Sequence, residues 1–190
     1  MTAEWSDLTG GGSPGDALPE RDLAPDKDLV PKRVVAEEAL NPADVRYAAM
    51  DLLARREHLQ RELETKLFKR FGELPDARDV IAGEVARLTA ENLQSDERYC
   101  NAYVVQRSAR GYGPERIQAE LSQKGADEKL IDGAMQLCEV DWRELAQQVR
   151  VKKFGAALPA DWPAKSKQLR FLQYRGFSGD QLSRLYSDSD

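Results

Sequence analysis

Arg107 to Leu121 read R-S-A-R-G-Y-G-P-E-R-I-Q-A-E-L, and the rest of the chain is organised around this stretch. Its basic segment ends in Gly111-Tyr112-Gly113. Pro114 follows, a residue suited to the first turn of a helix because its missing N–H would have no partner there. Ile117 and Leu121 are four residues apart and form one apolar stripe of that helix. The stretch therefore predicts two helices that meet at a glycine turn, with arginines and a tyrosine at the joint.

Similar units lie before and after this stretch. Apolar residues that occupy the same place in successive helices recur at offsets of 50 to 54 residues: Leu67, Leu121 and Leu172, and then Ile81, Ile131 and Leu182. Self-similarity at a fixed period is typical of a repeat array. A unit of about fifty residues is small for an independent core, so the units are expected to stack on their neighbours. The sequence predicts an all-α fold of three tandem three-helix repeats that form an elongated, curved array.

Local signals set the ends of these helices: polar N-cap residues, prolines at first helical positions and glycines after apolar stripes. The predicted helices cover residues 42 to about 56, 59–71, 77–89, 95–110, 114–124, 127–138, 141–153, 163–174 and 178–186. Caps are expected at Asn41, Asp76, Ser95, Asp127 and Ser178. The predicted repeats are 42–94, 95–139 and 140–190. Pro75 after Phe71-Gly72 indicates that the turn in the first repeat differs from the central one.

Residues 1–41 are predicted to be a disordered acidic leader. They hold nine acids and four bases, whereas residues 42–190 hold 24 of each, so the formal net charge of −5 belongs to the leader. The glycine-rich run Gly10 to Gly15 and regularly spaced prolines leave few apolar residues to offset the entropy of ordering. Val34-Val35 with Leu40 form an apolar patch that is a candidate for docking on the body. Because the body is balanced, a basic surface there requires segregation of charge.

Residue counts argue against several classes of protein. His58 is the only histidine, so it has no partner for a triad and is interpreted as a polar turn residue. Cys100 and Cys138 lie among apolar helical positions and are expected to be buried free thiols; with one histidine they cannot build a four-ligand zinc site. The N-terminus has no signal-peptide pattern, and no apolar stretch approaches the ~20 residues of a membrane span. The sequence predicts a cytoplasmic, non-enzymatic protein without cofactor, metal ion or membrane contact.

Basic residues recur at the end of the first helix of each repeat: Arg55-Arg56, Arg107 with Arg110, and Lys152-Lys153. Bases at these ends also complement the helix dipole, and this explanation stays open. In a superhelix the same positions would form one basic stripe, suited to phosphates or to an acidic protein groove. The candidate partner-binding residues are Arg55, Arg56, Arg107, Arg110, Tyr112, Arg116, Lys152, Lys153, Lys165, Lys167, Arg170 and Arg175.

Gly111-Tyr112-Gly113 lacks the lysine of a Walker motif and follows a helix, so it is not a phosphate loop. It is either a turn that glycine permits, or a turn that also presents Tyr112 to a partner, and both readings stay open. The side chains of Arg107 and Arg110 are expected to be exposed. Trp142 and Trp162 are expected to pack in the core and not to stack on bases.

The central block R-G-Y-G-P-x-R-I-x-x-E-L followed by K-G, with S-D-E-R-Y at Ser95 to Tyr99, resembles the bacterial RecX family, regulators of the RecA recombinase. The resemblance covers roughly Pro42 to the C-terminus. It implies three tandem three-helix repeats that bind along the groove of a RecA filament on single-stranded DNA and restrain ATP hydrolysis and strand exchange. The family pattern does not require the acidic leader.

Two other classes of function remain open. One is a helical protein that binds single- or double-stranded DNA directly without RecA, and the other is a helical scaffold with no role on DNA. The protein is expected to be a monomer. Phosphate binding without RecA should weaken steeply with salt, whereas binding to the filament should require RecA.

Overall fold

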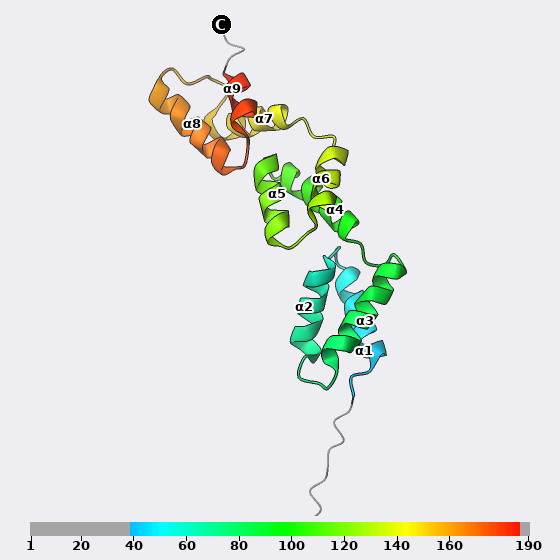
Figure 1. The fold of residues 1–190 in the computed structure, drawn as a ribbon. Helices are drawn as coiled ribbons and strands as arrows, with labels where there is room; N and C mark the ends of the chain where they lie inside the picture. The colour runs from blue at the N-terminus through cyan, green and yellow to red at the C-terminus, as the bar shows by residue number, and fades with distance from the viewer. Residues whose placement is uncertain (1–38, 187–190) are drawn as a thin grey trace, which may run out of the picture. The chain divides into compact units, whose positions relative to one another are not determined.

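The computed structural model describes residues 39–186, and within that range every regular element is an α-helix (Figure 1). The helices are α1 (Pro42–Leu53), α2 (Gln60–Phe71), α3 (Ala77–Ala90), α4 (Asp96–Ala109), α5 (Pro114–Gln123), α6 (Glu128–Leu137), α7 (Trp142–Phe154), α8 (Trp162–Tyr174) and α9 (Gly179–Leu185). The all-α prediction is confirmed. The predicted leader, with its patch at Val34-Val35, lies outside the described residues except for its last three.

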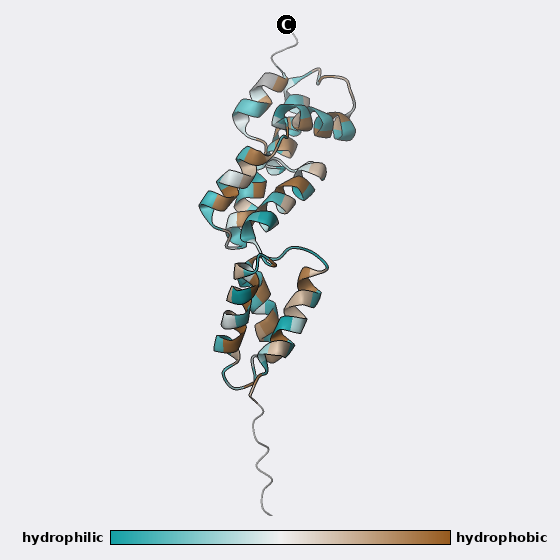
Figure 2. Cartoon of the chain, turned by 90° about the vertical axis from the view of Figure 1, so that its right-hand side faces the viewer, coloured by the Kyte–Doolittle hydropathy of each residue, from teal (hydrophilic) through white to brown (hydrophobic). Residues whose placement is uncertain are grey.

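The helices pack in three consecutive groups: α1–α3, α4–α6 and α7–α9. We call these groups the first, second and third unit. Each unit surrounds its own apolar core, to which α2, α5 and α8 contribute Leu67, Leu121 and Leu172. Figure 2 shows hydrophobic and hydrophilic residues interleaved along the helices, as amphipathic packing requires. The boundaries predicted for the repeats stay predictions. Among the helices of residues 39–186, none combines the length and the apolar content that a membrane span needs.

The ends of most helices follow from local chemistry. The side chains of Asn41, Ser95 and Asp127 accept hydrogen bonds from backbone N–H groups in the first turns of α1, α4 and α6. Ser178 forms a reciprocal capping box at the start of α9. Asp76 occupies the N-cap position of α3 as predicted, but its side chain caps no N–H group, because its backbone is left-handed (φ 56°) where the chain turns sharply into α3.

The glycine turns differ between units in the way that the sequence predicts. Gly125 and Gly176, after α5 and α8, have φ values of +84° and +91°, a conformation that glycine adopts without a steric penalty. Gly72, after α2, stays right-handed at φ −66°. Pro75 and Asp76 then carry the change of direction into α3, so the first unit closes its turn by a different route.

Two side chains link neighbouring units through the second core. Leu59, just before α2, is buried in the core of α4–α6, and Trp142, the first residue of α7, packs against the same core. Complete burial of a leucine side chain contributes about 1.5–3 kcal/mol. The second core is therefore partly built by residues that precede and follow its own helices.

The second and third units also meet backbone to backbone. The Gly113 N–H donates to the Arg175 carbonyl (2.8 Å) and the Glu115 N–H donates to the Gly176 carbonyl (3.0 Å). A Cβ atom on Gly113 would lie 2.3 Å from the Gly176 oxygen, and one on Gly176 would lie 2.3 Å from the Arg116 Cβ. Both positions must therefore be glycine for the start of α5 to reach the end of α8.

Candidate partner-binding surface

The turn between α4 and α5 holds Tyr112 among three arginines. The guanidinium carbons of Arg107, Arg116 and Arg175 lie 4.0, 4.8 and 5.1 Å from the centre of the Tyr112 ring. These arginines come from α4, α5 and the end of α8, so the junction between the second and third units brings them together. Each such cation–π contact contributes about 0.5–1 kcal/mol at an exposed site.

Glu120 on α5 anchors this cluster. Its carboxylate accepts hydrogen bonds from Arg107 Nε (2.7 Å), Arg116 Nε (3.0 Å) and the Tyr103 hydroxyl (2.8 Å), and it also pairs with Arg107 Nη2. Partial burial alone would raise the pKa of Glu120, but the hydrogen bonds from Arg107, Arg116 and Tyr103 together lower it to about 2. The carboxylate is therefore ionised at neutral pH and fixes both arginines.

The prediction that Arg107 is exposed is wrong. Its side chain is 16% exposed, because it lies between the Tyr112 ring and Glu120. Arg110, at the end of α4, is exposed as predicted, and no salt bridge within residues 39–186 involves it. The two arginines, grouped in the sequence analysis, thus have different environments. Arg107 stabilises the turn, whereas Arg110 is open to a partner.

A pocket of about 650 Å³ lies beside this turn and is lined by residues of α4, α7 and α8. Its apolar floor is formed by Leu145, Val149 and Phe171. Its rim carries four of the predicted cations: Arg110, Lys152, Lys153 and Arg175. No aspartate or glutamate lines it, and none of the four cations forms a salt bridge with another described residue. We call this site the basic pocket.

The backbone of the turn forms one wall of the basic pocket. Arg175 Nη1 donates to the carbonyls of Arg110 (3.0 Å) and Gly111 (3.3 Å), which end α4. Gly111 has φ +75°, and a Cβ atom there would lie 2.7 Å from Val149 Cγ2. The missing side chain at Gly111 thus lets α7 approach the turn and close the pocket.

The structure does not bring the other predicted residues into the basic pocket. Arg55 and Arg56 follow α1, and they pair with Asp51 (2.8 Å) and Glu62 (2.5 Å) in the first unit. On α8, Lys167 and Arg170 are exposed, and the half-buried Lys165 lies 5.0 Å from the centre of the Tyr186 ring. Arg116 and Tyr112 are half-buried in the arginine cluster.

The exposed side of α8 is basic and carries an aromatic residue at each end. Trp162 is 69% exposed, so the prediction that it packs in the core is wrong, and Tyr174 is 77% exposed. Lys167 and Arg170 lie between them, and α8 contains no acidic residue. The core of the third unit takes Leu172 from this helix and leaves the two end positions to solvent.

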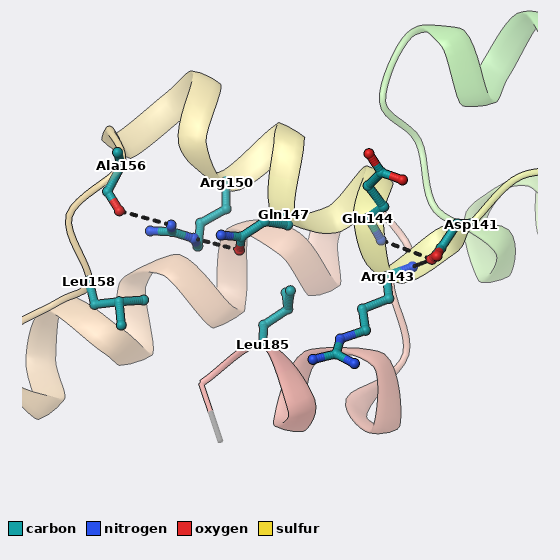
Figure 3. A pocket seen from close by; sticks show the side chains of 8 residues that line it. All are labelled: Asp141, Arg143, Glu144, Gln147, Arg150, Ala156, Leu158 and Leu185. Atoms are coloured by element: carbon teal, nitrogen blue, oxygen red, sulfur yellow. Dashed lines mark hydrogen bonds between the residues drawn. The ribbon is translucent and has the colours of Figure 1, made fainter. Parts of the chain in front are cut away.

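Arg150 is a buried cation that sequence reasoning did not separate from its exposed neighbours. Its side chain is 1% exposed. It donates to the Ala156 carbonyl (3.2 Å) and to Gln147, as Figure 3 shows. It also donates to the carbonyls of Ala157 (3.1 Å) and Gly155 (3.4 Å). Arg150 thus holds the loop after α7. The only sequence signal for this role is that Arg150 lies four residues after the buried Ala146, on the same face of α7.

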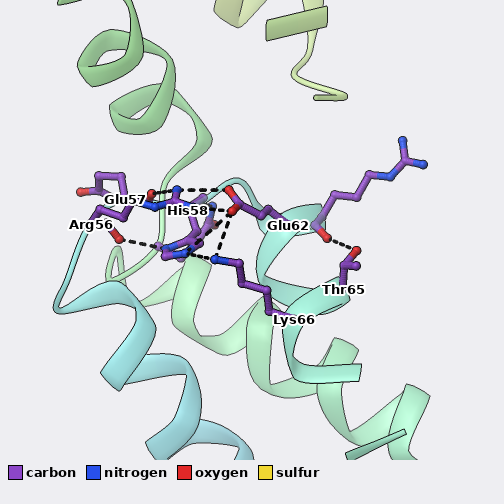
Figure 4. Close-up of polar contacts among 8 residues, drawn as sticks. Arg56, Glu57, His58, Glu62, Thr65 and Lys66 are labelled. Atoms are coloured by element: carbon purple, nitrogen blue, oxygen red, sulfur yellow. Dashed lines mark hydrogen bonds and ion pairs between the residues drawn. The ribbon is translucent and has the colours of Figure 1, made fainter. Parts of the chain in front are cut away.

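His58 is also buried, at 2% exposure, which corrects its interpretation as a polar turn residue. Its Nδ1 lies 3.0 Å from the Arg56 carbonyl and its Nε2 lies 3.0 Å from Lys66 Nζ (Figure 4). A carbonyl can only accept and an ammonium can only donate, so the ring is neutral with its proton on Nδ1. Burial lowers the pKa of His58, and the charges of Arg56 and Lys66 lower it further.

Of the two cysteines, Cys100 is a buried free thiol as predicted, whereas Cys138, at the end of α6, is partly exposed. Burial raises the pKa of the Cys100 thiol to about 11. Cys100 is therefore protonated and unreactive at neutral pH, which suits a core residue.

Comparison with known proteins places this architecture in a family. A family model for RecX, second three-helix domain, matches residues 95–135, and one for RecX, third three-helix domain, matches residues 139–185. A crystal structure of RecX from Lactobacillus salivarius has the same fold: the TM-score is 0.64 at 22% identity, over 77% of this chain and 95% of that one.

Sequence relatives are closer. The regulatory protein RecX of Pseudomonas fluorescens is 47% identical over 143 residues, which cover 75% of this chain and 90% of the relative. That of Ectopseudomonas mendocina is 44% identical over 150 residues, which cover 79% of this chain and 97% of the relative. The identity extends over almost the whole of each relative, and the chain therefore belongs to the RecX family of regulatory proteins.

Proposed function

We propose that this protein is a non-enzymatic regulator that binds the RecA filament on single-stranded DNA and restrains its ATP hydrolysis and strand exchange. Membership in the RecX family supports a regulator of RecA in general. The observation that carries the finer proposal is the basic pocket, where three helices bring together four cations without a carboxylate.

The pocket suits binding to a repetitive partner. Its rim combines residues of the second and third units, and these units are joined by backbone hydrogen bonds at Gly113 and Glu115. The helix ends that carry the cations are therefore held at a fixed spacing before binding, which lowers the entropy that association costs. Contacts from more than one unit to successive protomers of a filament would add avidity. Binding of this kind restrains a motor protein without any chemistry of its own.

The test is RecA-catalysed ATP hydrolysis on single-stranded DNA, measured as the purified protein is added. We expect the wild-type protein to slow hydrolysis. We expect Lys152→Glu with Lys153→Glu to inhibit far less, because both lysines are exposed and the reversal places negative charge on the rim. Pelleting with filaments, with and without DNA, reports whether binding itself is lost.

The chain offers a matched control for this variant. Lys69-Arg70 precede Phe71-Gly72 at the end of α2 as Lys152-Lys153 precede Phe154-Gly155 at the end of α7, and Lys69 and Arg70 are also exposed. Lys69→Glu with Arg70→Glu changes the net charge and the helix dipole in the same way, away from the basic pocket. Equal loss of inhibition in both variants would show that inhibition depends on net charge and not on the basic pocket. A wild-type protein that leaves ATP hydrolysis unchanged would refute the proposal.

A second candidate function, direct binding of single-stranded DNA without RecA, is favoured by the exposed side of α8. Its cations Lys167 and Arg170 lie between Trp162 and Tyr174, and aromatic side chains beside cations are the usual elements of single-strand binding. The test is a salt titration of binding to an oligothymidylate. Binding through phosphates should weaken along a slope of about −0.7 per contact in a plot of log affinity against log salt. Affinity that Trp162→Ala and Tyr174→Ala leave unchanged would exclude base stacking.

A further inference from the structure

We propose that the basic pocket is a docking site for an acidic peptide segment that carries a large apolar side chain. The proposal specifies what the proposed function leaves open, namely which chemical feature of the partner the pocket recognises, and it rests on that function only for the identity of the partner. It is carried by three observations: the charge of the rim, the chemistry of the floor and the way the pocket is held open.

The rim carries more positive charge than its helices require. Arg110, Lys152-Lys153 and Arg175 stand at the C-terminal ends of α4, α7 and α8. Each such end has about half a negative charge, so three ends offset roughly one and a half of the four positive charges. About two and a half positive charges remain, and no carboxylate within the described residues pairs with them. A ligand with two or three carboxylates matches this excess.

The floor selects against a nucleic acid. Leu145 and Val149 present methyl groups, which pack against an apolar side chain and offer no aromatic face to a base. Phe171 is the one aromatic residue of the lining. Its ring is half-buried, with the Arg175 guanidinium over it at 5.3 Å and Phe154 in an edge contact at 5.4 Å. A single-strand site instead presents open rings on which bases stack.

The pocket is preformed, so a short segment can bind without ordering the protein. Arg175 is fixed by the carbonyls of Arg110 and Gly111, and Val149 packs on the Gly111 backbone. The other three cations of the rim, Arg110, Lys152 and Lys153, are exposed and free to move toward a ligand. A volume of about 650 Å³ accommodates one large side chain with neighbouring backbone, within the usual range for ligand sites.

The experiment uses the full chain and short fluorescein-labelled peptides followed by anisotropy. The first probe has aspartates on both sides of one phenylalanine. In the second probe the phenylalanine is replaced by glycine, and in the third the aspartates are replaced by asparagine. We expect the first to bind saturably and each of the others to bind about tenfold more weakly or worse, since the pocket reads both charge and apolar surface.

Variants of the protein then test whether the first probe binds at the basic pocket. Lys152→Glu with Lys153→Glu should weaken binding of the first probe by about tenfold or more, whereas Lys152→Arg with Lys153→Arg should retain it. The matched variant Lys69→Glu with Arg70→Glu should bind like the wild type. Val149→Ala, which shortens the floor, should weaken the first probe while leaving the much weaker binding of the glycine probe unchanged.

Three results would overturn the docking site. The first is binding of none of the peptides. The second is equal binding of the phenylalanine and glycine probes. The third is displacement of the first probe by an oligothymidylate whose own binding depends on the same lysines, which would assign the pocket to nucleic acid. Failure of the proposed function can be told apart from failure of the docking site. If the protein binds the first probe through the pocket but leaves RecA-catalysed ATP hydrolysis unchanged, the docking site is supported and the role on RecA is refuted.

Discussion

At the turn between α4 and α5, one carboxylate organises the side chains that surround Tyr112. Glu120 accepts hydrogen bonds from Arg107, Arg116 and Tyr103, and Arg107 and Arg116 in turn lie over the Tyr112 ring. Removal of the carboxylate leaves two guanidinium groups close together without their anion. The arginines of this turn are therefore best understood as part of the fold, while Arg110 beside them is open to a partner.

We predict that Glu120→Gln lowers the free energy of unfolding at neutral pH by about 1–3 kcal/mol, the usual contribution of a charged hydrogen bond in a partly buried site. The pKa of Glu120 is depressed to about 2, so its contribution is complete above pH 4.5 and is lost as the pH falls toward 2. Urea unfolding at pH 7 and at pH 3 measures both effects. The difference between variant and wild type should shrink at the lower pH.

Glu115→Gln is the control, because Glu115 is exposed in the first turn of the same helix. Its effect should stay within about 0.5 kcal/mol. A Glu120 variant as stable as the Glu115 variant would show that the arginines find other partners.

His58 gives a second dependence on pH. Its pKa is lowered by burial, so the folded protein favours the neutral ring, and protonation of the unfolded chain reduces stability as the pH falls below 6.5. We predict that the free energy of unfolding decreases between about pH 6.5 and pH 5 in the wild type. His58→Asn should flatten this slope, since the chain has no other histidine. An equal slope in both proteins would assign the effect to carboxylates.

At the scale of elements, the contact between the start of α5 and the end of α8 depends on two glycines. We predict that Gly113→Ala destabilises the protein by about 1–3 kcal/mol, because the new Cβ would overlap the Gly176 carbonyl and force the units apart. Gly113 has φ −84°, so alanine carries no backbone penalty there and the effect reports the contact alone.

Gly133→Ala is the matched substitution for this test. Gly133 lies inside α6 with nothing within 4 Å of a new Cβ, so alanine should stabilise by about 0.5–1 kcal/mol. Thermal unfolding followed by circular dichroism compares the two. The two substitutions are expected to change the melting temperature in opposite directions. A stabilising Gly113→Ala would mean that the junction can accommodate an additional methyl group.

The helices could be predicted from the sequence because their determinants are local. Pro42 and Pro114 start helices, Ser95 and Ser178 cap them, and leucines four residues apart mark their buried faces. The same rule predicts the N-cap position of Asp76 correctly but not the missing side-chain hydrogen bond, since residue type alone does not reveal a left-handed backbone. Trp162 is exposed although it is a large aromatic residue, so residue type alone does not predict its environment.

The candidate site could be predicted only as a set of residue types. The sequence identifies Arg110, Lys152-Lys153 and Arg175 as cations near helix ends, but their convergence on one pocket depends on contacts between residues about 65 apart, such as Arg175 with Arg110. Burial of Arg107 and His58 depends likewise on Glu120 and Lys66, which no local pattern pairs with them. Long-range packing decides which charges are structural and which are available.

At the scale of the whole molecule, neighbouring units are coupled by different means. The first and second units share polar contacts, in which Gln94 Nε2 donates to the His58 carbonyl (3.0 Å) and to Asp96 (2.6 Å), besides the buried Leu59. The second and third units share backbone hydrogen bonds at the two glycines. In an array of this kind, the free energy of unfolding is approximately the sum of the stability of each unit and the contribution of each contact between neighbouring units.

We predict from this that loss of one contact between units affects only the two units that share that contact. Gly113→Ala should speed amide hydrogen exchange in α5 and in α7–α9, which meet at the altered contact, and should leave α1–α3 unchanged. Exchange followed by mass spectrometry resolves the three units. Uniformly faster exchange in all three units would instead indicate that they unfold as one cooperative unit.

The junction also bears on the order in which the chain is made. Gly113, the N-cap of α5, has no side chain with which to cap the helix, and the N–H groups of Gly113 and Glu115 bond to the carbonyls of Arg175 and Gly176. Those acceptors are synthesised some sixty residues later. On the ribosome, these two N–H groups at the start of α5 therefore stay hydrated until Arg175 and Gly176 have left the exit tunnel.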